Sequence, residues 1–328
     1  MISNSTNIIF FQSIFTIFVH MTRTIIGIGE TVLDIVFRGG QPQAAVPGGS
    51  VFNSMISLGR TVGRRFPGVR LLMESQVGDD YVADMVADFM AANGVSTEGI
   101  KRAKGQSVVS LAMLDENNNA HYEFYRDKDL PPFRTPDTAV RPDDIALFGS
   151  FFAVSPVTGR QAGEFISRAK EAGAIVYYDI NFRKNHPAEP ARFEANIALA
   201  DIVRGSSEDI EYLYGSSDAA KVYREHIAPL CRNFICTRGG EDAEVFSPGV
   251  HGVFPTAPVE KIVSTIGAGD NFNAGIIYAL VKNGFGKARL ERLTADDWAL
   301  LVPTAMKFSA NVCGSLYNYV DPGFADSI

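Results

Sequence analysis

The sequence predicts an α/β fold: a mainly parallel β-sheet between two layers of helices, with a smaller β-sheet beside it. Short apolar runs alternate with longer segments of helical spacing from residue 24 onward, and such alternation is typical of βαβ units in a parallel sheet. Residues 106–127 instead hold two runs of alternating polarity around "DENNN", which is the pattern of a β-hairpin outside a parallel core. Binding groups are therefore expected at the carboxyl ends of the parallel strands.

The elements of the main layer follow one another along the chain. Residues 24–30, "TIIGIGE", form an apolar run that ends in Gly and Glu, as a buried strand does before a turn. Residues 50–63 follow a Pro-Gly-Gly break and have helical spacing, and residues 69–78 predict a strand. Residues 79–94 begin with two acids and end with Asn-Gly, which are start and stop signals of a helix. The alternation continues with a strand, a helix and a strand at residues 144–153, 157–173 and 174–181.

The hairpin and the stretch "TVLDIVFRGG" supply strands that do not fit the parallel core. We expect them, within about 31–48 and 105–130, to form a separate sheet that covers one end of the main domain as a lid. Exposed sheet edges can pair with another chain. A homodimer through the lid is therefore expected.

Composition narrows the classes of partner. The 328 residues are 46% hydrophobic and 20% charged, with 30 Lys and Arg against 37 Asp and Glu, a net charge of -7. No basic block stands out, so nucleic acid is not an expected partner. The three cysteines form no CxxC pair and accompany no His cluster, which argues against a disulfide framework or a structural zinc site. Free thiols in a reducing cytoplasm are the expectation.

The N-terminus carries an apolar run, "NIIFFQSIFTIFVH". It is too short to span a bilayer as a helix, and it lacks the basic region and cleavage site of a signal peptide. No membrane partner is therefore expected. Met21 then opens "MTRTIIGIGE", which reads as the natural start of the first strand. We expect residues 1–20 to be an N-terminal extension or a mis-called start, and the domain to span residues 21–328.

The stretch 264–276, "STIGAGDNFNAGI", places Gly267, Ala268 and Gly269 directly before Asp270 and an apolar run of helical spacing. The first N–H groups of a helix have no partner inside it and form the positive end of its dipole. Small residues leave these groups open, so the junction predicts an anion site. A carboxylate there would take the proton from a hydroxyl that attacks a phosphoryl group. Asp270 as a simple helix cap is the structural alternative.

Two other phosphate-binding patterns are missing from the sequence. No GxxxxGK[ST] motif occurs, which excludes a P-loop protein. Gly27 and Gly29 begin a glycine pattern, but Val32 stands where a dinucleotide fingerprint has its third glycine. A nicotinamide enzyme is therefore poorly supported.

Several stretches together resemble the PfkB/ribokinase-like carbohydrate kinases, from about residue 24 to near the C-terminus. "PGGSVFNSMISLGRTVG" resembles the N-terminal glycine-pair signature of that family, and "STIGAGDNFNAGI" resembles its C-terminal signature. The intermediate stretches lie in the family's order: "GIGETVLD", "QVGDDYVADMV", "YDINFR", "RGSSEDIEYL" and "TRGGEDA". The resemblance implies a ribokinase-like three-layer α/β/α domain and an ATP-dependent kinase that uses Mg²⁺.

The resemblance also implies residue roles. Asp270 would be the general base, and Gly267, Ala268 and Gly269 would form the anion hole. The residues implied at the sugar are Asp34, Gly48, Gly49, Asn53, Arg126 from the lid hairpin, and Arg183, which would clamp a phosphate or sugar oxygen. Those implied along ATP are Asn181, Ser206, Thr237, Gly239, Gly240 and, near the adenine, Asn311. Glu208 and Asp209 would bind Mg²⁺ through water, while the alternative for this segment is a helix start capped by Ser206 or Ser207.

One position departs from the pattern of the family. Ser264 stands where members usually have Asp, in a loop that in many of them helps to hold a monovalent cation. A serine can donate oxygen but supplies no charge. The resemblance therefore leaves dependence on K⁺ in doubt.

The substrate is expected to be a sugar. "GETVLD" and "HYEFYRD" resemble the fructokinases and the 2-keto-3-deoxygluconate kinases. Arg126 would pair strongly with a sugar acid, whereas Asp34 would repel one. We expect fructose and its 6-phosphate, with 2-keto-3-deoxygluconate as the near alternative. A nucleoside kinase, in which the aromatic side chains of Phe52, Tyr122, Phe124 and Tyr125 stack a base, and a catalytically inactive regulatory protein of the same fold are the other readings.

Overall fold

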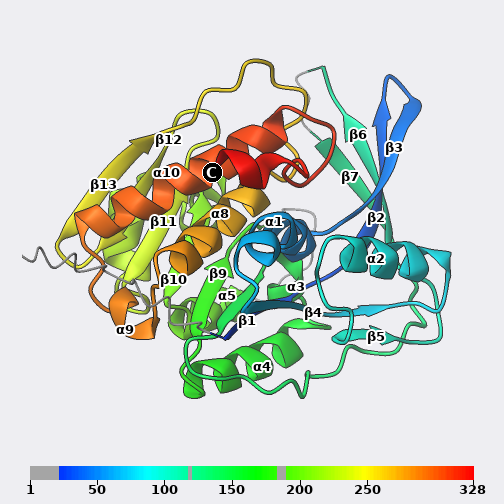
Figure 1. The fold of residues 1–328 in the computed structure, drawn as a ribbon, viewed down its shortest axis with the longest axis horizontal. Helices are drawn as coiled ribbons and strands as arrows, with labels where there is room; N and C mark the ends of the chain where they lie inside the picture. Colours follow the sequence, from blue (N-terminus) through cyan, green and yellow to red (C-terminus); the bar gives the residue numbers. More distant parts are fainter. Residues whose placement is uncertain (1–21, 117–119, 183–189) are drawn as a thin grey trace, which may run out of the picture.

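The computed structural model describes residues 22–116, 120–182 and 190–328 (Figure 1). The expectation for residues 1–20 and the role of Arg183 lie outside these residues. No helix in the described part of the chain combines the length and the apolar character that crossing a bilayer requires.

The strands of the large sheet are β1 (Arg23–Ile28), β4 (Val69–Val77), β5 (Ile100–Arg102), β8 (Ile145–Gly149), β9 (Ile175–Asp179), β10 (Ile202–Ser206), β11 (Asn233–Thr237), β12 (Asp242–Ser247) and β13 (Val250–Pro255). Among the described residues these nine strands lie in the order β13-β12-β11-β10-β9-β8-β1-β4-β5. The pairs from β5 to β11 are parallel, and β12 and β13 pair antiparallel at the other edge. Every residue of β1, β8, β9 and β11 is buried, which explains why these strands appear as continuous apolar runs in the sequence.

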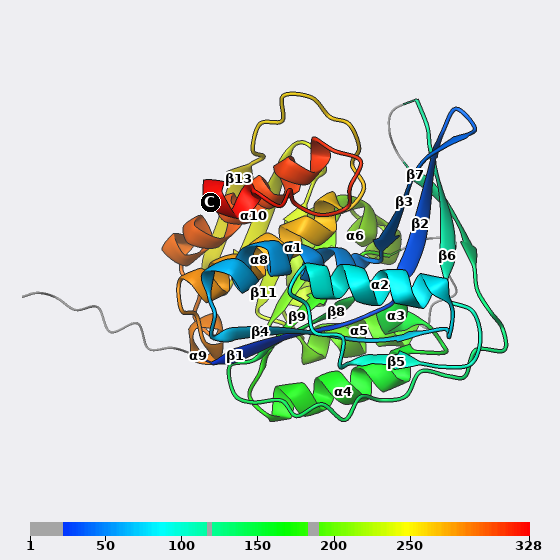
Figure 2. The ribbon, with the colours of Figure 1, turned by 45° about the vertical axis from the view of Figure 1, so that its right-hand side comes forward.

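Helices cover both faces of this sheet (Figures 1 and 2). The helices on one face are α1 (Ser50–Arg65), α2 (Tyr81–Ala92), α8 (Ala268–Lys282), α9 (Lys287–Leu290) and α10 (Ala295–Cys313). Those on the other face are α3 (Ser150–Val154), α4 (Gly159–Glu171), α5 (Pro190–Leu199), α6 (Ser207–Tyr214), α7 (Ala219–Val222) and the π-helical turn η1 (Tyr223–Ile227). A 3₁₀ turn, η2 (Phe324–Ser327), ends the chain.

Two hydrophobic cores result, one on each face. Successive strand residues point to opposite faces, so Ile25 and Tyr177 belong to the core under α1, α8 and α10, while Ile26 and Tyr178 belong to the core over α4 and α5. The structure therefore confirms the three-layer α/β/α arrangement.

The small sheet consists of β2 (Val32–Arg38), β3 (Gln41–Gly48), β6 (Val109–Leu114) and β7 (Ala120–Tyr125), in the order β3-β2-β6-β7. β6 and β7 pair antiparallel, as the hairpin pattern predicts, whereas β2 and β6 are parallel. Figure 2 shows this sheet standing away from the large one, beyond α2 and α3. The four strands of the small sheet lie at the carboxyl end of β1, where the chain continues into β2.

One predicted strand is wrong in its second half. Residues 144–153 were expected to be extended throughout, but β8 ends at Gly149 and α3 begins at Ser150. Ser150 has a φ of 54°, so the chain leaves the strand direction there. A short apolar run such as "FFA" has no periodicity that separates a buried strand from a buried helix.

Helix α8 is packed between α1 and α10 and holds the Gly-Ala-Gly-Asp junction at its first turn. Residues 270–280 are all buried, so no side of this part of the helix faces solvent, as expected of a central helix. A Cβ on Gly275 would lie 2.4 Å from the Cα of Ala305 in α10. Glycine at 275 therefore allows the two helix backbones to touch.

Replacing Gly275 tests this close approach. The Gly275→Ala variant must push α8 and α10 apart, and we expect it to lose about 1–3 kcal/mol of unfolding free energy. The matched change is Gly163→Ala on α4, where an added Cβ has no neighbour within 4 Å. That variant should gain up to about 1 kcal/mol because alanine favours the helix. Thermal unfolding followed by circular dichroism gives both values, and equal melting temperatures for the two variants would contradict the packing argument.

Candidate active site

A cavity of about 910 Å³ lies where the parallel strands end, beneath the small sheet. Its walls come from the segments that follow β1, β8, β9, β10 and β11, from α1 and the start of α8, and from β2 and β7 of the small sheet. This is the carboxyl-end location that the parallel sheet predicts.

The first turn of α8 opens into this cavity through Gly267 and Gly269. Gly267 has a φ of 76°, and a Cβ on it would lie 2.8 Å from the carbonyl oxygen of Asn318. A side chain is therefore excluded there on both conformational and steric grounds. The N–H of Ala268 donates to Thr265 O over a long 3.3 Å, whereas those of Gly267 and Gly269 have no acceptor among the described residues. Main-chain donors at the positive end of a helix are thus available to an anion.

Asp270 stands at this helix start, 8% exposed, and lines the cavity. Among the described residues, Ser50 Oγ donates to Oδ1 of its carboxylate at 2.7 Å, Asn53 Nδ2 donates to Oδ2 at 2.8 Å, and Asn181 Nδ2 lies 3.4 Å from Oδ1. The hydroxyl of Ser54 also donates to the main-chain oxygen of Asp270 at 2.7 Å. These bonds fix the carboxylate in one orientation between α1 and the end of β9. The N-cap position of α8 is Gly267, and these bonds join the Asp270 carboxylate to other elements instead.

Asn181 follows β9 and adopts a φ of 34°, a region that asparagine tolerates better than most residues. Its amide donates to Ser50 Oγ at 2.9 Å and points at Asp270. The structure thus places Asn181 beside Asp270, on the wall of the same cavity. Its side chain orients the carboxylate in this structure.

Asp34 lies on β2, only 5% exposed, and lines the cavity. Its carboxylate accepts hydrogen bonds from the Ser110 hydroxyl and, at 3.1 Å, from Asn318 Nδ2. Burial raises the pKa of Asp34 to about 6, opposed by the Ser110 and Asn318 bonds and assisted by the negative charge of Asp270. A carboxylate held in this way can accept further hydrogen bonds from a polar ligand, but it repels an anionic one.

The glycine pair before α1 makes room for this carboxylate. A Cβ on Gly48 would lie 2.2 Å from Asp34 Oδ2, and one on Gly49 would lie 2.2 Å from the main-chain oxygen of Glu30. Asn53, one turn into α1, has an Oδ1 that is buried without a hydrogen-bond partner among the described residues. Asp34, the two glycines and Asn53 therefore surround one polar corner of the cavity.

Arg126, expected to reach the substrate, is held by another side chain. Both of its terminal nitrogens donate to the carboxylate of Glu30, the second at 2.9 Å. Its guanidinium also lies 5.0 Å from the ring centre of Phe124 and 5.2 Å from that of Phe151. Glu30 lines the cavity, and Arg126 contacts it through this carboxylate. The charge of Arg126 is therefore largely neutralised before any ligand arrives.

The start of α6 forms the helix cap that one of the two interpretations of this segment predicts. Ser206 caps the helix, accepting from the N–H of Asp209 at 3.0 Å, while Asp209 accepts from the N–H of Ser206 at 2.7 Å and from that of Phe182 at 2.8 Å. This is a capping box that also fixes the chain after β9. The carboxylate of Asp209 is thus occupied by main-chain donors. Glu208 is exposed and lines the cavity, so it is the acid that can hold a hydrated Mg²⁺.

No group of three or more metal-ligating side chains occurs among residues 22–116, 120–182 and 190–328. Mg²⁺ keeps several waters and needs few protein ligands, so Glu208 with water fits such an ion. Ser264 is 2% exposed, and its Oγ accepts the N–H of Ile266 at 3.1 Å. That hydroxyl stabilises the turn before α8 without supplying a negative charge. The turn is therefore a poor match for a cation site built on a carboxylate.

The residues expected along ATP do not lie together: Gly239 lines the large cavity, and Asn311 lines a second one. Thr237 ends β11 and accepts a hydrogen bond from Arg204, and Gly239 lines the large cavity. The main-chain oxygen of Gly240 accepts from the Thr256 hydroxyl at 3.1 Å. Asn311 lines a second cavity of about 580 Å³ beside α10.

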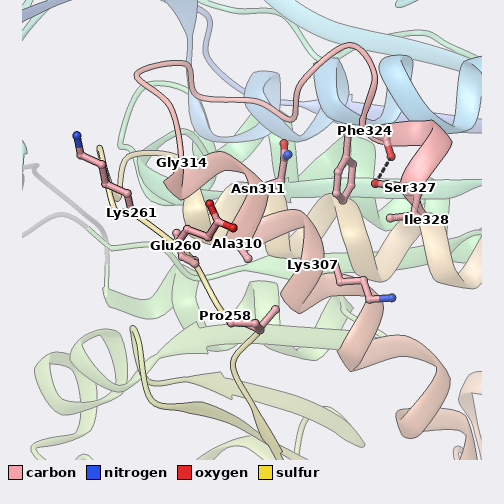
Figure 3. Close-up of a pocket in the computed structure, with 12 residues that line it drawn as sticks. Pro258, Glu260, Lys261, Lys307, Ala310, Asn311, Gly314, Phe324, Ser327 and Ile328 are labelled. Atoms are coloured by element: carbon pink, nitrogen blue, oxygen red, sulfur yellow. Dashed lines mark hydrogen bonds between the residues drawn. The ribbon is translucent and has the colours of Figure 1, made fainter.

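Figure 3 shows this second cavity, with Asn311 and Gly314 near the end of α10, Glu260 on the loop between β13 and α8, and Phe324 on η2. The amide of Asn311 donates to Asp321 Oδ2 at 3.1 Å and accepts from the Asp321 N–H at 2.9 Å. Asn311 therefore ties the C-terminal segment to α10. Its side chain lines the cavity while it is hydrogen-bonded to Asp321.

Arg204 lines the large cavity beside the α8 start, although no sequence motif predicts a role for it. The same holds for Ser50, which donates to Asp270, and for Glu30, which binds Arg126. The signal for Arg204 was present, because "ADIVRGS" places a lone cation inside a buried apolar strand. Ser50 and Glu30 carried no such signal, since their partners are far away in the sequence.

The raised pKa of Asp34 predicts a stability that depends on pH. Its value of about 6, against 3.8 for an ordinary Asp, means that the folded state holds the proton more tightly than the unfolded state. The contribution of Asp34 to the unfolding free energy therefore falls as pH rises from about 4 to 6, by on the order of 3 kcal/mol. Asp34→Asn removes this penalty but also loses a hydrogen bond. We expect the variant to melt a few degrees above the parent at pH 8, and this advantage to disappear near pH 4.

Asp80→Asn is the matched control. Although burial opposes it, the Ser107 and Ala83 hydrogen bonds lower the pKa of Asp80. Its ionised form therefore stabilises the fold above the unfolded pKa, and that contribution is lost as pH falls. Asp80→Asn should melt below the parent at pH 8 and approach it in acid. The melting temperatures of both variants are compared with the parent from about pH 2 to pH 8, because the contribution of Asp80 is lost only below its ordinary pKa of 3.8. Differences from the parent that change in the same direction with pH for both variants would contradict the assignment.

Comparison with known proteins agrees with this geometry. The chain is 28% identical over 268 residues to a fructokinase of Rhizobium leguminosarum bv. trifolii, covering 77% of this chain and 78% of that one. It is 26% identical over 290 residues to a probable fructokinase-2 of Arabidopsis thaliana, covering 82% and 80%. An aminoimidazole riboside kinase from Salmonella enterica has the same fold, with a TM-score of 0.77 at 19% identity over 93% of this chain and 98% of that one.

A fructokinase from Xylella fastidiosa with bound ATP superposes with a TM-score of 0.74 at 24% identity, covering 90% of this chain and 93% of that chain. These solved structures confirm the ribokinase-like fold. The profile of the pfkB family of carbohydrate kinases matches residues 38–292. This span includes the Gly-Ala-Gly-Asp start of α8 and most of the cavity that it opens into. The chain therefore belongs to the pfkB family of carbohydrate kinases.

Proposed function

We propose that this carbohydrate kinase transfers the γ-phosphoryl group of ATP to the C6 hydroxyl of fructose, forming fructose 6-phosphate and ADP. One observation carries the proposal. Asp270 is fixed in the large cavity beside main-chain N–H groups of Gly267 and Gly269 that have no acceptor among the described residues. A proton acceptor and an anion site thus stand side by side, which is what phosphoryl transfer to an alcohol requires.

In the proposed reaction the sugar hydroxyl gives its proton to the carboxylate of Asp270. The hydroxyl oxygen forms a bond to the γ-phosphorus, while the bond from that phosphorus to the bridging oxygen breaks. The electron pair of the broken bond stays on ADP. The N–H groups at the start of α8 stabilise the negative charge on the phosphoryl oxygens during this exchange. Bound Mg²⁺ would neutralise phosphate charge, and Glu208 is the residue that would hold its water shell.

The charges around the cavity favour a neutral sugar. Asp34 and Glu30 both line it, and the Arg126 guanidinium is already bound by Glu30. A sugar acid would be repelled by the carboxylate of Asp34, while the charge of Arg126 is already balanced by Glu30. Fructose offers hydroxyl donors to Asp34 and to Oδ1 of Asn53, which has no hydrogen-bond partner among the described residues. The 2-keto-3-deoxygluconate alternative is therefore disfavoured, and the fructokinase relatives support the choice.

A riboside is the second candidate. The rings of Tyr122 and Phe124 stack at 5.8 Å between centres on β7, and both line the cavity. Such a pair offers an aromatic surface to a base. The structural likeness to the aminoimidazole riboside kinase is the reason to include ribosides among the substrates tested.

The remaining expectations stay proposals. The Ser264 turn is stabilised by its own hydrogen bond, so we expect initial rates that change less than about twofold when K⁺ replaces choline at constant ionic strength. A homodimer through the edges of the small sheet is expected, and a monomer in light scattering would contradict it. The three free cysteines are consistent with the proposed cytoplasmic location.

Replacing the proposed base tests the function. We expect the purified enzyme to turn over fructose with ATP, and Asp270→Asn to lower kcat by at least about 100-fold, because the variant cannot take the hydroxyl proton. The affinity for ATP, measured by calorimetry, should change little. The assay covers fructose, 2-keto-3-deoxygluconate, ribose and adenosine with coupled detection of ADP.

The control is Asp84→Asn, a change to an exposed acid on α2, which should leave kcat unchanged. Turnover of adenosine in preference to fructose would support the riboside candidate over the proposed sugar. Sugar binding without any turnover by the parent enzyme would instead favour the regulatory reading.

A further inference from the structure

Arg204 is a buried cation that the proposed chemistry does not yet use. It lies on β10 in the middle of the large sheet and is 7% exposed. It nevertheless lines the large cavity, together with Gly269 and Asp270. A charged side chain in the interior needs either a complete set of partners or a ligand.

The Arg204 guanidinium lies directly against the first turn of α8. A Cβ built on Gly269 would be 2.9 Å from Nη1, 3.0 Å from Nη2 and 3.2 Å from Cζ. The whole head group therefore faces the main chain of Gly269, whose N–H has no acceptor among the described residues. Glycine at 269 serves two purposes here, because it exposes the amide and admits the guanidinium.

Two neighbouring strands fix the orientation of Arg204. Nη1 donates to Asp179 Oδ1 at 3.1 Å, and Nη2 donates to Thr237 Oγ1. Arg204 and Asp179 are register partners on adjacent strands, so they share a face of the sheet. Asn273 on α8 donates to the other oxygen of Asp179 at 2.8 Å and accepts from the Tyr177 hydroxyl at 3.0 Å. The network thus connects β9, β10, β11 and α8.

These partners leave part of the guanidinium unused. An arginine carries five N–H donors, and the described residues accept only the two bonds to Asp179 and Thr237. Its Nε is buried without a partner among those residues. The ion pair with Asp179 explains why the Arg204 guanidinium lies where it does. Some of its N–H donors at the cavity wall still have no acceptor among the described residues.

We propose that Arg204 binds the oxygens of the phosphoryl group during its transfer, adding a fixed positive charge to the main-chain donors at the start of α8. The inference rests on the proposed function, because it assigns a residue to the same anion site. Arginine stays protonated at every working pH, and its planar fork matches phosphate oxygens better than an ammonium does. Asp179 and Thr237 would be positioning residues that hold the fork in place.

The experiment compares Arg204→Met and Arg204→Lys with a buried arginine elsewhere. Arg23 begins β1 at the opposite end of the sheet, is 4% exposed, donates from Nη2 to Phe285 O at 2.8 Å, and also has an unpartnered Nε. Arg23→Met therefore controls for the loss of a buried charge. The readouts are kcat on fructose, the melting temperature, and calorimetric affinities for ADP and for a non-hydrolysable ATP analogue.

We expect Arg204→Met to lower kcat about 100- to 1,000-fold. Its affinity for the ATP analogue should fall about tenfold or more, against less than about threefold for ADP, because only the analogue carries the third phosphate. Arg204→Lys should lie between Met and the parent in both properties. Arg23→Met should lower the melting temperature and leave kcat and the ratio of the two nucleotide affinities unchanged.

Equal losses of ADP and analogue affinity in Arg204→Met, or a kcat no lower than that of Arg23→Met, would overturn the proposal. If the Met variant does not fold, Arg204→Lys decides: a parent-like kcat and affinity ratio would count against the assignment. A parent enzyme that turns over no sugar would reject the proposed function, and the two calorimetric affinities would still test Arg204 by themselves.

Discussion

The site depends on one constraint, which is that the start of α8 must be open at its main chain while residues 270–280 of the same helix are buried. Its N–H groups can serve an anion only if no side chain covers them, and Gly267 and Gly269 meet that condition. Its position is fixed by contact with α1 and α10. The bonds from Ser50 and Asn53 to Asp270 then tie the same turn to α1. A rigid helix start and an oriented carboxylate thus come from the same packing.

Charge is concentrated around this point at a cost in stability. Asp34 and Asp179 are both buried, and burial raises the pKa of each to about 6. Both lie close enough to Asp270 for its charge to contribute to that rise. Arg204 offsets part of this charge, and its own bonds keep it beside α8. Unfavourable electrostatics of this kind are typical of functional sites, where binding or catalysis gains what stability loses.

The small sheet completes the cavity from the other side. β2 brings Asp34 to the wall, and β7 brings Tyr122 and Phe124. The bond between Glu30, after β1, and Arg126, after β7, connects the two sheets at this wall. A neutral, hydroxyl-rich ligand suits the resulting surface of carboxylate and amide oxygens. In the proposed reaction, the parallel sheet would supply the groups that bind phosphate, and the small sheet would supply the groups that select the acceptor.

The sequence by itself determined the alternation of strands and helices, the hairpin of the small sheet, and the Gly-Ala-Gly-Asp start of a central helix. These features are local, because periodicity, turn residues and helix termini are encoded within a few neighbouring positions. Only the tertiary structure decided that Glu30 forms an ion pair with Arg126, that Asp209 accepts a hydrogen bond from the Phe182 N–H, and that Arg204 faces Gly269. Each of these contacts joins residues from different elements. Their partners depend on strand order, register and the distance between helices, and no short stretch of sequence specifies those quantities.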